Sequence, residues 1–554
     1  MTKATVTLGC WLCLFPLGCT RETPDPAAVS GGSGGQGGRG RGEGGRGQSD
    51  AGTPRDDAGP AAGRGGSGGR QAPVAGSSGS GGRGGSGGRG PDAGATSDDD
   101  AGVDLPIEPP IEVPELGAAL EPGDPGAADV TVEVRTDQPM HVISPLIYGT
   151  NRGADLASTH HSVVRAGGNR YTAYNWENNA SNAGLDYFFQ NDGFLSSSNA
   201  PAWAVLESVS DATRHGAASI VTVPIVDYVS ADKNADGDVR DSGDDYLDTR
   251  FKQNQADKPS AIAKVPNVGD PHVYQDEFVS YLRLHAPAER RILFALDNEP
   301  DLWSSTHPEV HPTAVTYAEL WTRTQRYARM IKRVWPSAPI LGFVSYGWNG
   351  FVNLQSASDA MGRDFIDWFL DQARAAEVNG GMRLIDYLDL HWYPEAVGGD
   401  DNTRITGEDT SAAVVAAREQ APRSLWDANY RENSWISSDY LQGPINLIPR
   451  LREQLAGHYP GTKLAFTEWN YGGGNHISGA IATADVLGIF GRERVSLAAH
   501  WPLTDAEPFT LAAFRAFRNY DGRGAAFGDV SLAAGSSNDE NVSIHASLAA
   551  DTPD

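Results

Sequence analysis

From about residue 130 onward, the chain alternates short apolar runs with longer amphipathic segments. Eight apolar runs predict buried strands, at residues 146–148, 162–166, 220–225, 292–296, 340–344, 387–390, 464–466 and 496–499. Helical patterns lie between several of them, most clearly over residues 313–335, where apolar side chains recur every three or four positions. Strands alternating with helices predict a parallel sheet. Eight repeats, with no Gly-x-Gly-x-x-Gly after an early strand, favour an α/β fold of the (β/α)8 TIM barrel type over an open doubly wound sheet.

Two glutamates follow apolar runs at the places where a barrel exposes its functional groups. Glu299 lies in Leu-Asp-Asn-Glu-Pro (296–300), after the fourth predicted strand, and Glu468 lies in Phe-Thr-Glu-Trp-Asn (466–470), after the seventh. Most glycoside hydrolases use a pair of such carboxylates for catalysis. An isolated Asn-Glu-Pro also fits a helix N-terminus whose glutamate complements the dipole. The second glutamate and its flanking residues favour catalysis.

Four longer strings extend this pattern in order along the chain. They are residues 167–170 with 174–179, then 297–303, 389–395 and 467–479. Together they closely resemble glycoside hydrolase family 44, from about residue 130 to the C-terminus. The resemblance implies a retaining endo-β-1,4-glucanase, often active on xyloglucan, mixed-linkage glucan, lichenan or xylan as well. It also implies a barrel with an attached β-sandwich and no required cofactor.

The resemblance assigns roles to individual residues. It makes Glu299 the acid/base and Glu468 the nucleophile, and retention needs their carboxyl groups about 5–5.5 Å apart. Asn298 is expected to hydrogen-bond the sugar 2-hydroxyl, a contact that tightens as the oxocarbenium ion forms. We expect Tyr393 to donate to Glu468 and keep it ionised, and His391 to orient its neighbours.

Several tryptophans are candidates for a sugar-binding groove, because a flat indole stacks on the apolar face of a glucose ring. Trp176, Trp426, Trp435 and Trp501 lie in loop-like or strand-end surroundings, and Trp501 follows the eighth predicted strand. We expect Trp501 to form the floor of the cleaved-sugar subsite. Core packing is the alternative for each tryptophan, and Trp321, inside the amphipathic helix, is expected in the core.

A further candidate site is an acidic segment that fits the first half of a calcium loop. Its oxygen-bearing side chains alternate as Asp232, Asn234, Asp236 and Asp238. The ligand expected at the twelfth position is missing, because Gly243 stands there. Structural Ca²⁺ and a plain acidic surface turn both remain open, and no catalytic metal is predicted.

The first nineteen residues are typical of an export signal. Lys3 is the only charge, residues 6–17 are largely apolar, and Leu-Gly-Cys at 17–19 resembles the end of a bacterial lipobox. The stretch is too short to span a membrane. Pro16 departs from the usual lipobox, so a lipidated Cys19 and ordinary cleavage without lipid both remain open. We expect a secreted or cell-surface protein. All three cysteines lie in this segment, so the mature domain has no disulfide and no thiolate metal site.

Composition indicates the domain boundaries, and the net charge excludes one class of binding partner. Residues 20–128 are rich in Gly, Ser, Arg and Asp with almost no large apolar side chain, which predicts a disordered tether. Residues 129–505 are assigned to the barrel, with 129–145 as a candidate sandwich strand, and 506–554 to an incomplete β-sandwich, so the chain is a shortened variant or a fragment. A formal net charge of −27 argues against nucleic acid as a partner. We expect a monomer that acts on β-glucan.

Two other functions stay open at this stage. Another glycosidase of the clan to which family 44 belongs, such as a xylanase or a mannanase, would share the Asn-Glu-Pro string but not Asn-His-Ile-Ser-Gly at 475–479. A carbohydrate-binding protein with an inactive site would keep an aromatic groove, but it would have no reason to keep both glutamates at strand ends.

Overall fold

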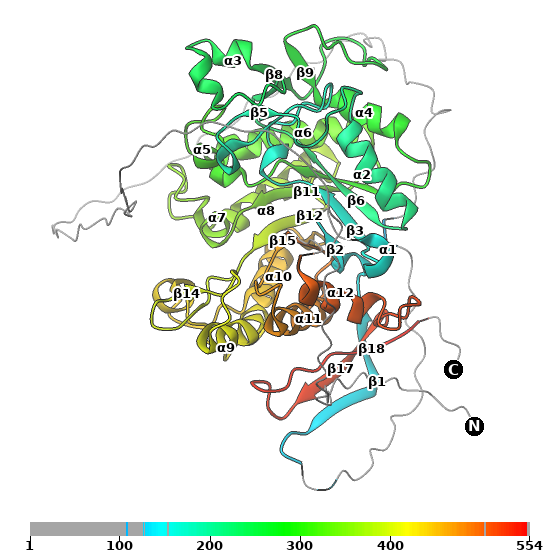
Figure 1. Cartoon of the computed structure of the whole chain (residues 1–554), viewed down its shortest axis with the longest axis vertical. Coiled ribbons are helices and arrows are strands. Elements are labelled where there is room, and N and C mark those ends of the chain that lie inside the picture. The colour runs from blue at the N-terminus through cyan, green and yellow to red at the C-terminus, as the bar shows by residue number, and fades with distance from the viewer. Residues whose placement is uncertain (1–106, 109–125, 127, 152–154, 503–505, 551–554) are drawn as a thin grey trace, which may run out of the picture. The chain divides into compact units, whose positions relative to one another are not determined.

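Eight parallel strands close into a barrel in the computed structural model, which describes residues 107–108, 126, 128–151, 155–502 and 506–550 (Figure 1). In chain order they are β2 (Gly149–Thr150), β3 (Val163–Ala166), β6 (Ala218–Val223), β10 (Ile292–Leu296), β11 (Ile340–Ser345), β12 (Tyr387–Trp392), β15 (Lys463–Trp469) and β16 (Leu497–His500). β16 pairs with β2 and closes the ring. The TIM-barrel prediction is confirmed. The predicted export signal and most of the predicted tether lie outside the described residues.

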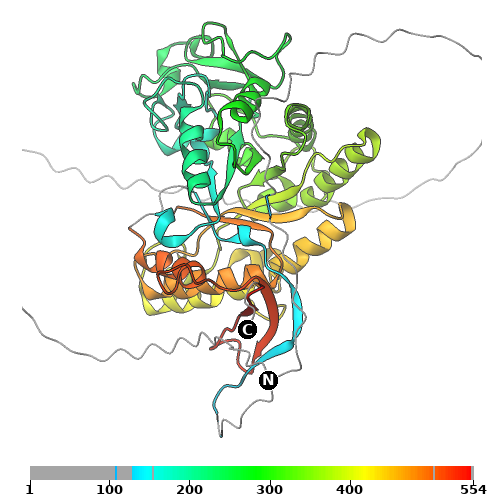
Figure 2. The same cartoon turned by 90° about the vertical axis from the view of Figure 1, so that its right-hand side faces the viewer.

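Each barrel strand is followed along the chain by a helix, and the helices surround the strands (Figures 1 and 2). These helices are α1 (Leu156–Thr159), α2 (Trp203–Arg214), α4 (Gln275–His285), α6 (Tyr317–Val334), α8 (Phe365–Gly380), α10 (Leu447–His458), α11 (Ile477–Arg492) and α12 (Pro508–Arg518). The connections contain four further helices: α3 (Tyr246–Thr249), α5 (Trp303–Thr306), α7 (Trp348–Asn353) and α9 (Ala412–Gln420). They also contain three small sheets. The first pairs β4 (Ser181–Asn182) with β5 (Asn191–Asp192), the second joins β7 (Tyr228–Ser230), β8 (Phe251–Gln255) and β9 (His272–Tyr274), and the third pairs β13 (Val397–Gly398) with β14 (Thr403–Arg404).

Most predicted strands lie within two residues of the observed ones, but the first is displaced. Residues 145–147 form a short 3-10 helix, and the strand begins at Gly149. The Ser144 hydroxyl accepts from the Leu146 amide, so a capping bond turns this apolar run into a helical turn. Helix α6 lies within the predicted range of residues 313–335. Thr316 caps its start, and Lys332 and Arg333 in its last turn complement the helix dipole.

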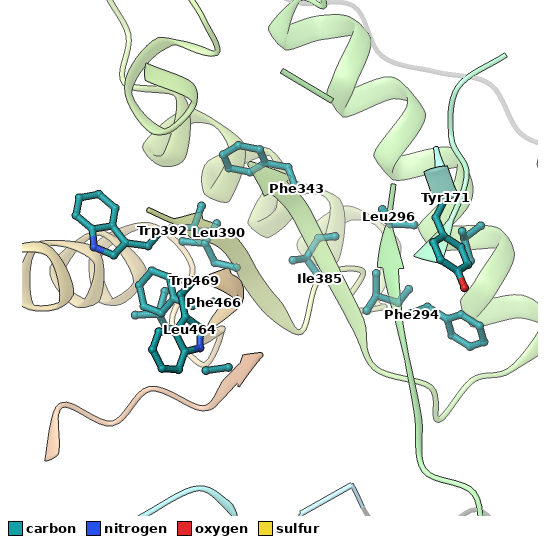
Figure 3. Packing of buried hydrophobic residues seen from close by; sticks show 14 of the residues in the cluster. Tyr171, Phe294, Leu296, Phe343, Ile385, Leu390, Trp392, Leu464, Phe466 and Trp469 are labelled. Carbon is teal, nitrogen blue, oxygen red and sulfur yellow. The ribbon is translucent and has the colours of Figure 1, made fainter. Parts of the chain in front are cut away.

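The barrel strands are apolar throughout because both of their faces are buried. On β10, Leu293 and Ala295 belong to a small cluster inside the barrel, whereas Phe294 and Leu296 belong to the larger cluster between strands and helices. Figure 3 shows this larger cluster, with side chains from β10, β11, β12 and β15. This alternation fixes which residues of each strand point into the barrel.

A three-stranded antiparallel sheet lies beside the barrel. It consists of β1 (Val132–Val142), β17 (Val530–Ser536) and β18 (Ala546–Leu548), in the order β1-β17-β18. The segment before the barrel therefore contributes a strand, in agreement with the sequence analysis. The described residues of this region form a single small sheet.

The predicted boundary at residue 505 is wrong. Helix α12 falls in the part assigned to the sandwich, yet it packs against α11 and α1 as the last helix of the barrel. Its buried face contains Leu511, Phe514 and Phe517, and Phe514 packs against His161 and His500. The helical spacing of these residues was the overlooked signal. No helix in the described part of the chain is long and apolar enough to cross a membrane.

Candidate active site

Several polar side chains gather inside the barrel at the carboxyl ends of its strands. Arg165 on β3 lies two residues beyond the inward-facing Val163, and His391 on β12 lies four beyond the inward-facing Tyr387. Strict alternation would turn Glu468 on β15 outward, in step with Leu464 and Phe466. A register shift places Glu468 opposite His391 instead. This irregularity aims the carboxylate into the barrel.

Glu468 is held by two fixed donors. Arg165 Nη1 donates to its Oε1 at 2.6 Å, and the Tyr393 hydroxyl donates to its Oε2 at 2.8 Å. The Glu468 side chain is 6% exposed and that of Arg165 is fully buried. The predicted contact from Tyr393 is therefore present.

Glu299 lies just beyond the end of β10, on a turn that begins the 3-10 helix Pro300–Leu302. Its backbone has φ 45° and that of Asp297 has φ 68°, both in the left-handed region that costs energy for residues with a side chain. Hydrogen bonds hold this turn: Glu299 N donates to Val344 O, and Asp297 accepts from Thr172 and Trp303. The strained turn brings the Glu299 carboxyl back over the barrel mouth.

His391 bridges the two carboxylates. Its Nδ1 lies 2.8 Å from Glu299 Oε1 and 3.5 Å from Glu468 Oε2, and its ring is fully buried. One ligand atom from each of these three side chains lies within 4.8 Å of the others. One oxygen of each carboxylate thus lies within 4.8 Å of the other, a close approach that suits the short carboxyl separation of retaining glycosidases better than the roughly 6.5–9.5 Å of inverting ones. The orienting role expected of His391 agrees with this position.

The two glutamates have opposite electrostatic surroundings. Burial raises the pKa of Glu299, and the negative charge of Glu468 raises it further, against the opposing effect of His391. Burial also acts to raise the pKa of Glu468, but His391, Arg165 and the Tyr393 hydrogen bond together hold it below the ordinary value. Glu299 thus keeps its proton to higher pH, and Glu468 is ionised at lower pH.

Asn298 is oriented by the same arginine that holds Glu468. Arg165 Nη2 donates to Asn298 Oδ1 at 2.7 Å, and Arg165 Nη1 also donates to Asn151 Oδ1 at 2.9 Å. Sequence reasoning missed both Arg165 and Asn151. A signal was present for Arg165, because it is a charged residue inside an apolar strand, at an inward-facing position near the carboxyl end.

Trp501 lies against the Gly167-Gly168 turn after β3, and its amide donates to Trp469 O, one residue beyond Glu468. Gly168 has φ 93°, and a Cβ at this position would lie 2.5 Å from the Trp501 ring. A Cβ on the preceding Gly167 would meet the Arg165 guanidinium at 2.4 Å. The Gly-Gly turn therefore leaves room for the Trp501 ring at one glycine and for the Arg165 guanidinium at the other. Trp501 is only partly buried, which leaves part of its ring accessible to a ligand.

Two of the other three predicted groove tryptophans lie away from the catalytic residues. Trp176 is 1% exposed, donates to Tyr274 O and stacks on Phe278, so this prediction is wrong and Trp176 is a core residue. Trp426 lies under the Arg492 guanidinium, at the end of α11 opposite the loop that follows Glu468, so it too is misplaced as a groove residue. Trp435 is partly buried against the core cluster. For Trp176 and Trp426, the polar neighbours in the sequence gave a false signal of a groove position, whereas the role of Trp435 stays a prediction.

Comparison with known proteins agrees with this geometry. The model of glycoside hydrolase family 44 matches residues 180–396. The structure of a Paenibacillus polymyxa xyloglucanase of this family, determined with xyloglucan, is 39% identical; the match covers 76% of this chain and 84% of that one, with a TM-score of 0.71.

The chain belongs to glycoside hydrolase family 44. Two curated relatives are each 41% identical over 76% of this chain: endoglucanase A of Paenibacillus lautus and β-mannanase/endoglucanase A of Caldicellulosiruptor saccharolyticus. The match spans 62% of the first protein and 33% of the second. Both relatives are thus considerably longer than the matched segment.

Family 44 enzymes need no cofactor, as the resemblance implied. In the candidate calcium loop, arginine side chains bind three of the four acidic or amide positions. Arg250 binds Asp232 and Asp236 at 2.7–3.0 Å, and Arg240 binds Asp238. Among the described residues, Glu299, His391 and Glu468 are the only group of His, Cys, Asp and Glu side chains that converges closely enough to hold an ion. The guanidinium charges of Arg250 and Arg240 thus offset those of the acidic loop, which favours the acidic surface turn of the two alternatives.

Proposed function

We propose that this family 44 chain is a retaining, endo-acting glycoside hydrolase that cleaves β-1,4-glucan backbones. One observation carries the proposal: two carboxylates lie within 4.8 Å, one with a raised and the other with a lowered pKa. A pair of this kind supplies a proton donor and an ionised nucleophile at the same pH. A binding protein without activity has no need of such a pair.

In the first step, Glu468 Oε attacks the anomeric carbon while Glu299 gives its proton to the leaving glycosidic oxygen. Arg165 and Tyr393 fix both oxygens of Glu468, so the carboxylate is oriented before the substrate arrives. In the second step, Glu299, now ionised, takes a proton from water, and the resulting hydroxide displaces Glu468. His391 contacts both carboxylates and is placed to offset the negative charge that passes from Glu468 to Glu299 between the two steps.

The preferred substrate is proposed from the relatives. The polymyxa enzyme is a xyloglucanase determined with xyloglucan, the lautus enzyme is an endoglucanase, and the name of the saccharolyticus protein adds a mannanase activity. We assign the β-1,4-glucan backbone, branched or unbranched, as the substrate and polysaccharide as the partner. A product profile on xyloglucan, cellohexaose, xylan and mannan tests this: turnover confined to mannan or xylan would contradict it.

The stereochemistry of the first product tests the carboxylate pair as a unit. If Glu299 and Glu468 act at their observed spacing, hydrolysis of cellopentaose releases the β-anomer, formed by two successive inversions. Proton NMR at early times reads the anomer before mutarotation. Initial release of the α-anomer would reduce Glu468 to a general base and overturn the mechanism.

We further propose that the chain is exported and anchored through lipidated Cys19, so that the enzyme works at the cell surface. The charge of Lys3, the apolar run of residues 6–17 and the Leu-Gly-Cys end support this proposal. Labelling of expressing bacteria with a fatty-acid analogue would mark the full chain but not a Cys19→Ala variant. Equal labelling of both would contradict the anchor.

A further inference from the structure

The floor of the barrel, at the amino ends of its strands, is covered by two residues from far earlier in the chain. Ile107 packs against the cluster inside the barrel, whose members include Leu293, Leu341, Tyr387 and Leu497. Ile107 and Glu108 are partly buried. Residues 20–128 were predicted to be a disordered tether, yet these two residues contact the barrel interior.

Glu108 makes two polar contacts at the same place. Its Oε1 accepts from the Tyr387 hydroxyl at 3.0 Å and from Lys463 Nζ at 2.7 Å. Tyr387 is the first residue of β12 and Lys463 is the first residue of β15, so Glu108 joins two neighbouring strands at their amino ends. The Lys463 ammonium also lies 5.4 Å from the centre of the Tyr387 ring, which adds a cation–π contact to the cluster.

The two kinds of contact explain why this pair of residues fits this place. The interior cluster ends at the floor, and an apolar side chain laid across it removes its lowest layer from water. Tyr387 is 2% exposed, so its hydroxyl needs an acceptor within the protein, and Glu108 supplies one. One residue thus covers the apolar floor and the next satisfies the polar group at its edge.

We propose that Ile107–Glu108 is a floor plug: a docking segment within the predicted tether that binds the amino end of the barrel. Glu299, His391 and Glu468 lie at the carboxyl ends of the strands, on the opposite side. The N-terminal segment therefore contacts the barrel through the plug, on the side opposite the catalytic residues.

A charge swap in the full chain tests the polar half of the plug. Glu108→Lys and Lys463→Glu each place like charges together, and we expect each to lower Tm by about 2–4 °C. The double variant restores opposite charges, and at least half of the loss should return. Neither residue belongs to the catalytic network, so kcat at 25 °C should stay unchanged. Additive losses in the double variant, or no loss in Glu108→Lys, would overturn the proposal.

Single cysteines test the apolar half. In a full chain whose three native cysteines are replaced by serine, we compare Ile107→Cys with Ala128→Cys, an exposed position. We expect the thiol at 107 to react with a maleimide at least about fivefold more slowly, and the difference should vanish in denaturant. Equal rates in the folded chain would overturn docking at this residue.

The chain contains a second copy of the same short sequence, which serves as a control. The tripeptide Pro-Ile-Glu occurs at residues 106–108 and again at 110–112. Ile107→Asp is expected to lower Tm more than Ile111→Asp, because the proposal assigns the floor to Ile107. The reverse order would overturn this register of the plug.

Discussion

The surroundings of Glu468 and Glu299 differ, although both side chains reach the same cleavage site. Glu468 lies on a barrel strand and has a fixed donor on each oxygen, from Arg165 and Tyr393. Glu299 lies on a strained turn outside the strand, is 16% exposed against 6% for Glu468, and shares His391 as its neighbour. Identical side chains thus acquire opposite protonation because one receives hydrogen bonds that favour its charged form and the other receives mainly burial.

The largest expected effect comes from removing the nucleophile. Glu468→Gln should lower kcat on β-glucan by at least about 10⁴-fold, because the amide cannot attack the anomeric carbon. Circular dichroism and oligosaccharide binding should remain close to those of the parent. Glu377→Gln, on α8 and away from the site, is the control with the same chemical change. Activity near the parent level in Glu468→Gln would refute the nucleophile assignment.

The next effect concerns the acid. Glu299→Ala should slow polysaccharide hydrolysis by about 10²–10⁴-fold, the usual contribution of a general acid. Aryl glycosides with good leaving groups need little protonation, so their cleavage should be retained to a much larger degree and rise further with azide. Rates on both substrate classes are the measurement. An equal loss on both would move the acid/base role to another residue.

A smaller effect tests the donors of Glu468. Tyr393→Phe removes the hydrogen bond to Oε2 and should lower kcat about tenfold. The tyrosine helps to keep the pKa of Glu468 low, so its loss raises that pKa. Activity falls as pH drops through this pKa, and the acidic limb of the kcat profile should move to higher pH. An unchanged acidic limb would show that Arg165 and His391 alone set the ionisation.

The smallest effect concerns a carboxyl near Glu299. Burial and the charge of Glu299 raise the pKa of Asp301 to about 7. This coupling is reciprocal, so the Asp301 charge that develops around this pH raises the pKa of Glu299. Asp301→Asn should move the alkaline limb of kcat to lower pH, with a change at the optimum below about threefold.

A control variant separates charge from structure at this position. Ser345 donates to Asp301 Oδ2 at 3.0 Å, and Ser345→Ala removes this bond while it keeps the carboxylate. The alkaline limb should stay close to that of the parent in this variant. The same displacement in both variants would mean that the effect comes from a shifted loop and not from the Asp301 charge.

Strand positions were predicted more accurately than the exposure of aromatic side chains, for a physical reason. Strands such as residues 292–296 were located correctly because a segment buried on both faces must be apolar along its whole length. Trp176 was misassigned because its polar sequence neighbours suggested exposure, whereas Phe278 and Tyr281, from a distant helix, bury it. Arg165 was missed because its partners come from β15 and from the turn after β10.

The alternation of strands and helices, the barrel, the family and the two glutamates could be predicted from the chain, because they depend on local apolar patterns and short strings. The tertiary structure added the groups that hold Glu468 ionised beyond the expected Tyr393, because its pKa depends on Arg165 and His391, which lie far from Glu468 along the chain. The same holds for the pairing of Arg250 with the acidic loop and for the contact of Ile107 with the barrel floor. Such contacts join segments whose spacing along the chain says nothing about their distance in space.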